Sequence, residues 1–318
     1  MNAFGSESTA DDVLAGTDLT GKQVLVTGAS AGLGVETVRA LAAHGANVTA
    51  AVRDLDKAKV ALAQAAPGTT VDLRELDLAD LTSIRHFAEA FLADHRRLDI
   101  LIGNAGVMAC PERRTADGFE MQFGTNHLGH FLLVNLLTPS LVAASGSRVV
   151  LLSSAGHRLS DVDLDDPGWE RTPYDPWAAY GRSKTANALC AVGLDARLAD
   201  QGVRAFAVHP GVIMTDLARD VTAEAWTAFQ ALLPKSDGEG GGKMAYKTIP
   251  QGAATTVYAA TSPDLDGMGG RYLEDCGLAE PTDDPVQRSG VRPYALDPKR
   301  ADALWSLSER LVGLSSTS

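Results

Sequence analysis

Tyr180 and Lys184 stand four residues apart, in the run Tyr-Gly-Arg-Ser-Lys. On a helix this spacing places both side chains on one face, one turn from each other. A phenol has an ordinary pKa of about 10, and a neighbouring ammonium group lowers it by stabilising the phenolate. The pair is therefore a candidate acid and base. The same short pattern also occurs on helices with a packed tyrosine and a solvated lysine, so other residues have to support this interpretation.

The elements around this pair have clear signals. Asp175 can cap the helix, Pro176 fits its first turn, and Gly202 can end it. An apolar run at residues 148–152 predicts a buried strand before that helix, and this strand delivers Ser154 to its carboxyl end. A serine hydroxyl is thus expected near the tyrosine and the lysine.

A second candidate site lies near the beginning of the chain. An apolar strand at residues 23–27 leads directly into a turn with Gly28, Gly32 and Gly34, and an apolar-striped helix follows. Glycines at these positions allow a tight turn and close approach to a pyrophosphate, while the helix N-terminus supplies amide groups and a positive dipole. The arrangement predicts a dinucleotide-binding turn.

The next predicted strand, residues 47–52, ends at Arg53, about 20 residues past the glycines. An acidic residue at this point would hold the ribose 2′-hydroxyl of NAD, whereas an arginine accommodates a 2′-phosphate. A guanidinium group suits a phosphate, so the sequence favours NADP(H) over NAD(H). Asp54 could reach a 2′-hydroxyl, which keeps NAD(H) as an alternative. Arg53 could also simply begin a solvated helix.

Apolar runs separated by helical stretches predict an α/β domain with a parallel sheet covered by helices on both faces. The expected strands lie at residues 23–27, 47–52, 70–76, 98–102, 148–152, 204–208 and 270–273. No linker divides the chain, so we expect an N-terminal arm at residues 1–20 and one domain at residues 21–318.

The pattern changes between residues 217 and 248. An apolar face is formed by Trp226, Phe229, Leu232 and Leu233. A glycine-rich run at residues 236–243 follows it. This segment is expected to be either a mobile lid over an apolar substrate or a disordered surface insertion.

Composition excludes several classes of function. A net charge of −12 argues against nucleic acid and anionic membranes as partners. The sequence has no apolar run of about 18 residues, so no membrane anchor is expected. The three cysteines lack metal-ligand spacing and indicate reduced thiols in a cytoplasmic protein. The aspartates between residues 161 and 166 lack the glycine and distal glutamate of a calcium loop, so no metal is predicted.

These motifs together resemble the classical short-chain dehydrogenase/reductase family. The residues that carry the resemblance are Thr27-Gly28-x-x-x-Gly32-x-Gly34, Asp77, Asn104-Ala105-Gly106, Asn126, Ser154, Tyr180-x-x-x-Lys184 and Pro210-Gly211. A closer resemblance to the retinol dehydrogenase and WW-domain oxidoreductase branch is carried by Arg53-Asp54, Asn126-His127-Leu128-Gly129-His130-Phe131, Ser183-Lys184-x-x-Asn187, Gly270-x-Tyr272-x-x-x-Cys276 and Leu304-Trp305.

The resemblance implies a single doubly wound Rossmann domain with a mostly parallel seven-stranded sheet. It implies that Tyr180 is the catalytic acid and base, that Lys184 lowers its pKa and holds the nicotinamide ribose, and that Ser154 binds the substrate oxygen. Asn126 would hold a water molecule that links Lys184 to solvent. Contacts with the cofactor are implied for Gly28, Ser30, Gly32, Leu33, Gly34, Arg53, Asp77, Leu78, Asn104, Ala105, Gly106, Tyr180, Lys184, Pro210, Gly211, Val212 and Thr215.

The predicted activity is NADP(H)-dependent interconversion of an aldehyde or ketone and an alcohol on a small apolar, retinoid-like or steroid-like substrate. The alternatives are an NAD-linked alcohol dehydrogenase and a non-catalytic cofactor-sensing protein, although the intact set of catalytic residues argues against the latter. The resemblance also implies a homodimer or homotetramer. The long loop between Ser154 and Tyr180 shapes one pocket wall and leaves the substrate open. His157 could line this pocket or lie on its rim.

Overall fold

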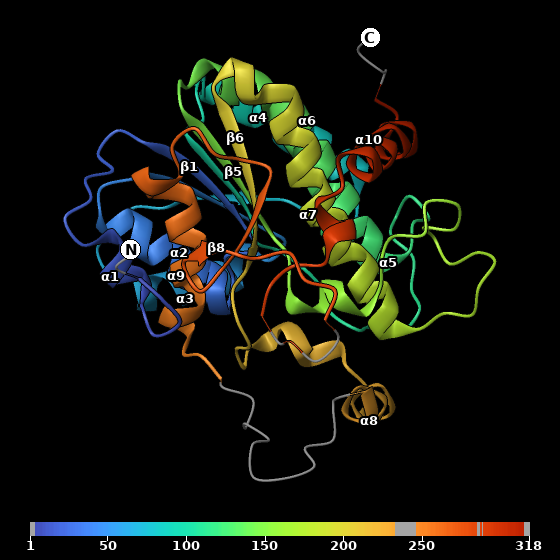
Figure 1. Cartoon of the computed structure of the whole chain (residues 1–318). Helices are drawn as coiled ribbons and strands as arrows, with labels where there is room; N and C mark the ends of the chain where they lie inside the picture. Colours follow the sequence, from blue (N-terminus) through green and yellow to red (C-terminus); the bar gives the residue numbers. More distant parts are fainter. Residues whose placement is uncertain (1–3, 233–245, 285–286, 288, 315–318) are drawn as a thin grey trace, which may run out of the picture.

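An eight-stranded sheet forms the centre of the protein (Figure 1). The structure, a computed structural model, describes residues 4–232, 246–284, 287 and 289–314. The strands are β1 (Gln23–Thr27), β2 (Asn47–Val52), β3 (Asp72–Glu75), β4 (Ile100–Gly103), β5 (Ser147–Leu152), β6 (Val203–His209), β7 (Arg271–Glu274) and β8 (Gly277–Leu278). Their order across the sheet is β3-β2-β1-β4-β5-β6-β7-β8. Neighbouring strands are parallel except β7 and β8, which confirms the mostly parallel sheet.

Strand β8 is additional to the seven predicted strands, all of which form. It pairs antiparallel with β7 across a turn in which Asp275 and Cys276 have φ angles of 48° and 56°. Two central residues with positive φ are typical of a type I′ turn, which Asn-Gly sequences usually form. An Asp-Cys turn beside a two-residue strand leaves no such signal in the sequence.

Strand β1 lies where the strand order reverses, with β2 on one side and β4 on the other. In open parallel sheets, ligands bind outside the carboxyl ends of the strands at such a point. The residues that follow β1 and β4 therefore border the crevice in which this fold binds ligands.

Helices cover both faces of the sheet, as predicted (Figure 1). One face is covered by α1 (Ala10–Leu14), α2 (Gly32–Ala43), α3 (Leu55–Ala65) and α9 (Ile249–Thr261), and the other by α4 (Leu81–Asp94), α6 (Gly129–Ala143), α7 (Pro176–Leu198) and α10 (Pro298–Val312). Val24 and Val26 of β1 pack into one core, whereas Leu25 packs into the other. A strand buried on both faces needs apolar side chains at successive positions, which explains its apolar run.

Part of the predicted N-terminal arm packs into the fold. Thr9 caps α1 through a capping box with Asp12, and Ala10 and Leu14 of this helix are fully buried. Helix α1 contacts α9. Five helical residues span little more than one turn, which is too short for a helical period to be recognised.

Helix α7 begins and ends as predicted. The Asp175 carboxylate accepts a hydrogen bond from the backbone amide of Ala178 at 2.6 Å, and Pro176 is in the first turn. A short 3-10 turn follows the helix, and Gly202 ends it with a φ of 80°. These two ends place Tyr180 in the first part of the helix.

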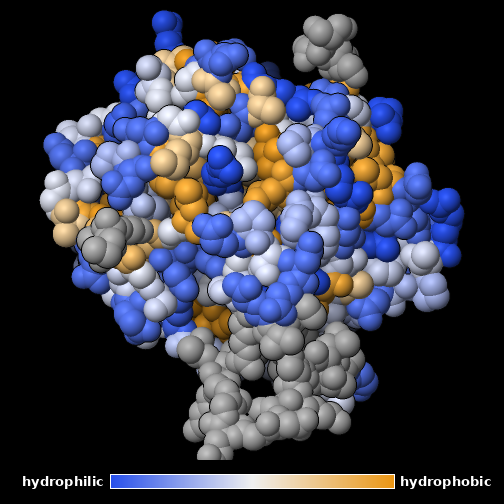
Figure 2. All heavy atoms as spheres, viewed as in Figure 1, coloured by the Kyte–Doolittle hydropathy of each residue, from blue (hydrophilic) through white to orange (hydrophobic). Residues whose placement is uncertain are grey.

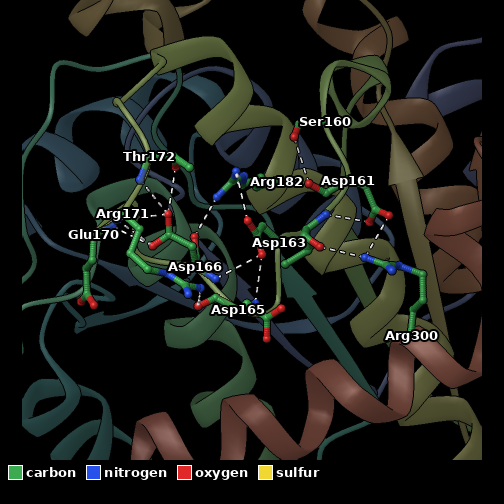
Figure 3. A network of polar contacts seen from close by, with 11 residues as sticks. Ser160, Asp161, Asp163, Asp165, Asp166, Glu170, Arg171, Thr172, Arg182 and Arg300 are labelled. Atoms are coloured by element: carbon green, nitrogen blue, oxygen red, sulfur yellow. Dashed lines mark hydrogen bonds and ion pairs between the residues drawn. The ribbon is translucent and has the colours of Figure 1, made fainter.

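The loop before α7 is held to two helices by arginine side chains (Figure 3). Within the loop, the Asp166 carboxylate accepts hydrogen bonds from three backbone amides. From α7, Arg182 donates to the Asp166 carbonyl and lies 3.8 Å from the centre of the Trp169 ring. From α10, Arg300 pairs with Asp161 at 2.9 Å. The aspartates thus hold this loop in place through amides and guanidinium groups.

The surface shown in Figure 2 is mostly hydrophilic, with apolar groups in smaller areas between the polar ones. This agrees with a charged-residue content of 21%. In the part of the chain that the structure describes, no helix is long and apolar enough to cross a membrane.

Candidate active site

The glycine turn between β1 and α2 has no room for side chains at two of its positions. A Cβ at Gly34 would lie 2.4 Å from the Gly28 carbonyl oxygen and 2.6 Å from the Asn104 side-chain nitrogen. A Cβ at Gly28, whose φ is 71°, would lie 2.7 Å from the Ala105 Cα. The N-cap of α2, Ala31, makes no side-chain cap, which leaves amides at this helix start for an anion. These features fit the pyrophosphate of a dinucleotide.

The run after β4 is held against the end of β1. The Asn104 side chain donates to the carbonyl oxygens of Thr27 and Gly28, at 2.8 and 3.2 Å. The Thr27 hydroxyl oxygen accepts from the backbone amides of Asn104 and Ala105, both at 3.0 Å. Thus Asn104 and Ala105, predicted from sequence as cofactor residues, lie directly against the glycine turn.

The residues after β6 reach the same place. A Cβ at Gly32 would lie 3.3 Å from the Thr215 methyl group, so Thr215 faces the glycine turn. The side chains of Leu33 and Ile213 both pack against Gly252, where an added Cβ would lie 2.7 Å from each of them. Gly211 has a φ of 101°, a conformation that favours glycine in the turn that follows β6. Pro210, Gly211, Val212 and Thr215 therefore belong to the predicted cofactor edge.

The remaining predicted cofactor residues lie farther along this edge. Arg53 is exposed at the end of β2, and Asp77 and Leu78 follow β3. The Asp77 carboxylate accepts a hydrogen bond at 2.9 Å from a backbone amide two residues later. A Cβ at Gly129 would lie 2.5 Å from the Leu78 carbonyl oxygen, so α6 begins in close contact with Leu78. Ser30 lies within the glycine turn.

Asn126 lies in a π-helical turn, Gly124–Leu128, between α5 (Met121–Phe123) and α6. The sequence predicts a continuous helical stretch here, and π turns of this kind often occur at functional sites. The Asn126 side-chain oxygen accepts a hydrogen bond from the Val107 backbone amide at 2.9 Å. Its side-chain nitrogen donates to the Ser183 hydroxyl oxygen, also at 2.9 Å. A Cβ at Gly106 would lie 3.1 Å from the Asn126 oxygen and 3.6 Å from the Lys184 nitrogen. Asn126, Gly106 and Lys184 are thus neighbours.

His130 joins the glycine turn to this asparagine, a role that sequence reasoning missed. Its Nδ1 lies 2.9 Å from the Asn126 carbonyl oxygen and must carry the proton, because a carbonyl only accepts. Its Nε2 then accepts from the Thr27 hydroxyl at 2.9 Å. Burial lowers the pKa of His130 to about 4, which keeps the ring neutral. The spacing of four residues from Asn126 is the signal that could have indicated this bond.

Ser154, Tyr180 and Lys184 lie together; the tyrosine and the lysine are buried, and the serine is partly exposed. The Ser154 hydroxyl oxygen accepts from the Gly156 amide at 3.0 Å and is hydrogen-bonded to Tyr180. The Tyr180 ring packs on Gly156, where a Cβ would lie 2.7 Å from the ring. Lys184 donates to the Leu152 carbonyl oxygen at 3.0 Å, and its nitrogen lies 5.6 Å from the centre of the Tyr180 ring. The structure therefore brings together the predicted acid, its serine partner and the lysine.

Burial shifts the two titrating groups in opposite directions. It raises the pKa of Tyr180 to about 12, although the bond to Ser154 acts to lower it. It lowers the pKa of Lys184 to about 8. Removal from water disfavours whichever form is charged, which explains both directions. The predicted lowering of the Tyr180 pKa by Lys184 is not found: desolvation dominates, and the phenol is protonated at neutral pH.

Apolar side chains border Tyr180, and the sequence did not indicate them. Trp177 packs edge-on against the Tyr180 ring, with ring centres 6.4 Å apart. Its indole N–H donates to the Ala225 carbonyl oxygen at 2.7 Å, which holds α8 (Ala223–Leu232) beside α7. Met108 packs on the same cluster. The predicted lid at residues 217–248 lies partly outside the described residues, since its glycine-rich run falls there.

His157 lies neither in a pocket nor on its rim. It is fully buried, and its Nδ1 is 2.7 Å from the Ser154 carbonyl oxygen. The sequence left its position open because its other ring partners, Tyr272 and Arg292, are more than 100 residues away in the chain.

Comparisons with known proteins agree with this geometry. A family model described as short chain dehydrogenase matches residues 22–226. Curated relatives include a Streptomyces lividans protein named "Probable oxidoreductase", which is 48% identical over 91% of this chain and 96% of its own length. Retinol dehydrogenase 12 of Mus musculus is 40% identical over 93% of this chain and 88% of its own. The WW domain-containing oxidoreductase of Pongo abelii is 39% identical over 97% and 72%.

Solved structures give the same result. The crystal structure of an uncharacterized protein from Mycobacterium Paratuberculosis superposes with a TM-score of 0.73 at 38% identity, over 96% of this chain and 98% of that one. A short chain dehydrogenase from Burkholderia cenocepacia J2315 in complex with NADP superposes with a TM-score of 0.62 at 25% identity, over 82% and 99%. These matches confirm the resemblance found in the sequence motifs.

Proposed function

The chain belongs to the short-chain dehydrogenase/reductase family, in its retinol dehydrogenase-like branch, and on this premise we propose that it interconverts an apolar aldehyde or ketone and its alcohol with NADP(H). The observation that carries the proposal is the grouping of Ser154 with the buried Tyr180 and Lys184 on the same sheet edge as the glycine turn. A proton donor beside a nucleotide cradle fits carbonyl reduction.

Tyr180 donates the proton to the substrate oxygen in this proposal. Its pKa of about 12 keeps the phenol protonated at neutral pH. The Ser154 oxygen accepts from the Gly156 amide, which orients the hydroxyl group. In the proposed complex its proton turns from the Tyr180 oxygen to the substrate oxygen and stabilises the negative charge there. The Lys184 ammonium, 5.6 Å from the ring centre, stabilises the phenolate that remains. When bound, the nicotinamide cofactor supplies or accepts the hydride.

Arg53 supports the choice of NADP(H). It is exposed at the end of β2, where a 2′-phosphate would be recognised. The competing carboxylate, Asp54, caps α3 by accepting from the Lys57 amide at 2.9 Å. The Burkholderia cenocepacia relative in complex with NADP supports the same choice.

Arg53→Glu tests this assignment. We expect the KM for NADPH to rise by about tenfold or more, because the variant replaces an attractive charge by a repulsive one, while the KM for NADH changes little. Lys59→Glu makes the same charge change at an exposed position on α3, six residues after Arg53, and serves as the matched control. Equal NADPH affinities of the two variants would refute the assignment.

Trp177 and Met108 beside Tyr180 support an apolar substrate. The relative named retinol dehydrogenase 12 supports an alcohol or carbonyl group as the reacting centre. The test is a panel of hydrophobic aldehydes and ketones mixed with protein and NADPH, followed by cofactor absorbance. Oxidation of NADPH that depends on an apolar carbonyl is expected. Turnover that persists undiminished in Tyr180→Phe would refute the mechanism.

A cytoplasmic location, a homodimer or homotetramer, and a lid role for the segment around α8 complete the proposal. Burial of the Trp177 to Ala225 hydrogen bond supports the last, since it holds α8 against the catalytic helix. Light scattering on purified protein tests the assembly, and a single-chain mass would refute it.

A further inference from the structure

His157 joins the catalytic serine to a distant part of the chain. It lies in a 3-10 turn, Ala155–Leu159, directly after Ser154. Two donors of His157 converge on the Ser154 carbonyl oxygen: its backbone amide at 3.0 Å and its Nδ1 at 2.7 Å. A carbonyl only accepts, so Nδ1 carries the proton. The Tyr272 hydroxyl of β7 also lies 3.1 Å from Nδ1.

The other ring nitrogen fixes the tautomer independently. The His157 Nε2 accepts from the Arg292 backbone amide at 3.1 Å, so it must be unprotonated. The His157 carbonyl oxygen accepts from the Tyr294 hydroxyl at 2.7 Å and from the Thr185 hydroxyl at 3.1 Å. Arg292 and Tyr294 belong to residues 289–296, which we call the docking segment, and Thr185 follows Lys184 on α7. The neutral ring thus connects the Ser154 turn to β7 and to the docking segment, and the His157 carbonyl oxygen adds the bonds to Thr185 and Tyr294.

The docking segment has further contacts with this region. The Arg158 guanidinium donates to the Gly290 carbonyl oxygen, and the Gly290 amide donates to the Glu274 carboxylate of β7. Tyr294 and its neighbours form a 3-10 turn, Pro293–Leu296, that contacts α7. The family model ends at residue 226, so this segment lies outside the part of the chain that the model matches.

We propose that His157 is a positioning residue for carbonyl reduction: its Nδ1–H fixes the Ser154 backbone so that the serine hydroxyl faces Tyr180, and the docking segment holds the imidazole in that orientation. The proposal rests on the proposed function. Ser154 lies two residues past the end of β5, so its orientation depends on what holds its carbonyl group. Misplacement of a reacting group by about 1 Å can lower turnover by about 100-fold.

Two amide substitutions separate the two halves of the ring. In His157→Asn the side-chain nitrogen can occupy the Nδ1 position and donate to Ser154, but nothing reaches Arg292. In His157→Gln the side-chain oxygen can accept from Arg292, but the donor to Ser154 is lost. We expect kcat to fall by about 10- to 100-fold in His157→Gln, and clearly less in His157→Asn, with the KM for NADPH unchanged in both. Equal kcat values for the two variants would overturn the proposal.

A second arm asks whether His157 acts through Ser154. In a Ser154→Ala background, His157→Gln should lower kcat no further, because the group that it positions is absent. Independent, multiplying losses would show a merely structural role and overturn the proposal. Arg148→Met is the control for general loosening, since Arg148 lies at the opposite end of β5, bonded to Ala259 and Asp266. It should lower stability and keep kcat.

A third arm does not require turnover. The Gly156 amide donates to the Ser154 hydroxyl, so its hydrogen exchange reports the position of that hydroxyl. We expect faster exchange at Gly156 in His157→Gln and near wild-type exchange in His157→Asn. Unchanged exchange in both would overturn the proposal. If wild type reduces no carbonyl of the panel while the exchange pattern is as expected, the proposed function fails and the positioning of Ser154 stands.

Discussion

The two parts of the candidate active site, the glycine turn after β1 and the residues of α7, differ in how they are built. In the proposed function the glycine turn holds the cofactor through its backbone: at Gly28 and Gly34 there is no space for a Cβ, and the start of α2 offers amides. The proposed catalytic residues of α7 act through side chains whose pKa values burial has shifted, Tyr180 upward and Lys184 downward. One part is therefore set by steric fit and the other by desolvation. Substitutions should separate binding from chemistry accordingly.

Hydrogen bonds join these two parts. The Thr27 hydroxyl bonds to His130, His130 bonds to the Asn126 carbonyl, and the Asn126 amide donates to the Ser183 hydroxyl. Ser183 donates in turn to the Tyr180 carbonyl oxygen at 2.8 Å. A displacement at the cradle can thus reach the catalytic helix through four side chains.

Tyr180→Phe should give the largest effect and show the separation most clearly. We expect kcat to fall by about 1,000-fold, because the proton donor is lost, with the NADPH dissociation constant nearly unchanged. Steady-state kinetics and fluorescence titration measure the two quantities. Tyr258→Phe on α9, whose hydroxyl bonds to Asp264 away from the site, is the matched control and should keep wild-type kcat. If Tyr180→Phe also lost NADPH binding, the separation of cofactor binding at the glycine turn from chemistry at α7 would be contradicted.

Gly34→Ala should produce the opposite pattern. Its Cβ would meet the Gly28 carbonyl at 2.4 Å, so the turn must shift and NADPH should bind about tenfold more weakly or worse. The shift should also lower the free energy of unfolding by about 1–3 kcal/mol. Calorimetric titration and denaturant unfolding measure these changes. Gly5→Ala, where a Cβ meets nothing within 4 Å, is the control. Wild-type affinity in Gly34→Ala would contradict steric control of the cradle.

Carbonyl reduction should slow as the pH rises above about 8, the pKa of Lys184. Tyr180 stays protonated in this range, but Lys184 loses the charge that stabilises the phenolate left by proton donation. Each further pH unit should lower kcat by about tenfold. Alcohol oxidation needs deprotonated Tyr180 and should instead accelerate. The pH dependence of kcat, measured for reduction and for oxidation by stopped-flow or steady-state kinetics, gives the sign of each change. If kcat fell equally with pH in both directions, the cause would be unfolding rather than titration of Lys184.

Thr27→Val should give the smallest of these effects. Thr27 begins the hydrogen-bond chain that connects the glycine turn to α7. The variant removes the acceptor of two amides and the partner of His130, at a cost of about 1–3 kcal/mol in the free energy of unfolding. Urea unfolding measures the loss. Thr27→Ser keeps the hydroxyl and should recover most of it. If both variants are equally stable, the hydroxyl does not join the two parts.

The sequence predicts the elements and catalytic group for a topological reason. Apolar runs identify the strands of a sheet buried on both faces, and parallel strands bring their carboxyl ends to one edge. Residues as distant as Gly28, Asn104 and Thr215 could therefore be grouped from sequence alone, and they do lie together. The cap at Asp175 could be predicted because capping depends on local residue types.

Other features depend on packing that no local pattern records. The π turn at Asn126 changes the hydrogen-bond register of a stretch whose composition is ordinary for a helix. The partners of His157 in the docking segment lie more than 130 residues along the chain. The raised pKa of Tyr180 arises from its burial, which only the assembled side chains produce.

The two edge strands of the sheet, β3 and β8, affect the tendency of the protein to aggregate at high concentration. Unpaired strand margins are templates for edge-to-edge aggregation, which short and charged strands resist. Here β3 has only four residues and carries Asp72, Arg74 and Glu75, while β8 has two. The small β8, which follows an unusual Asp-Cys turn, thus covers β7 and leaves little backbone for another chain to extend. This architecture favours a protein that stays dispersed at high concentration.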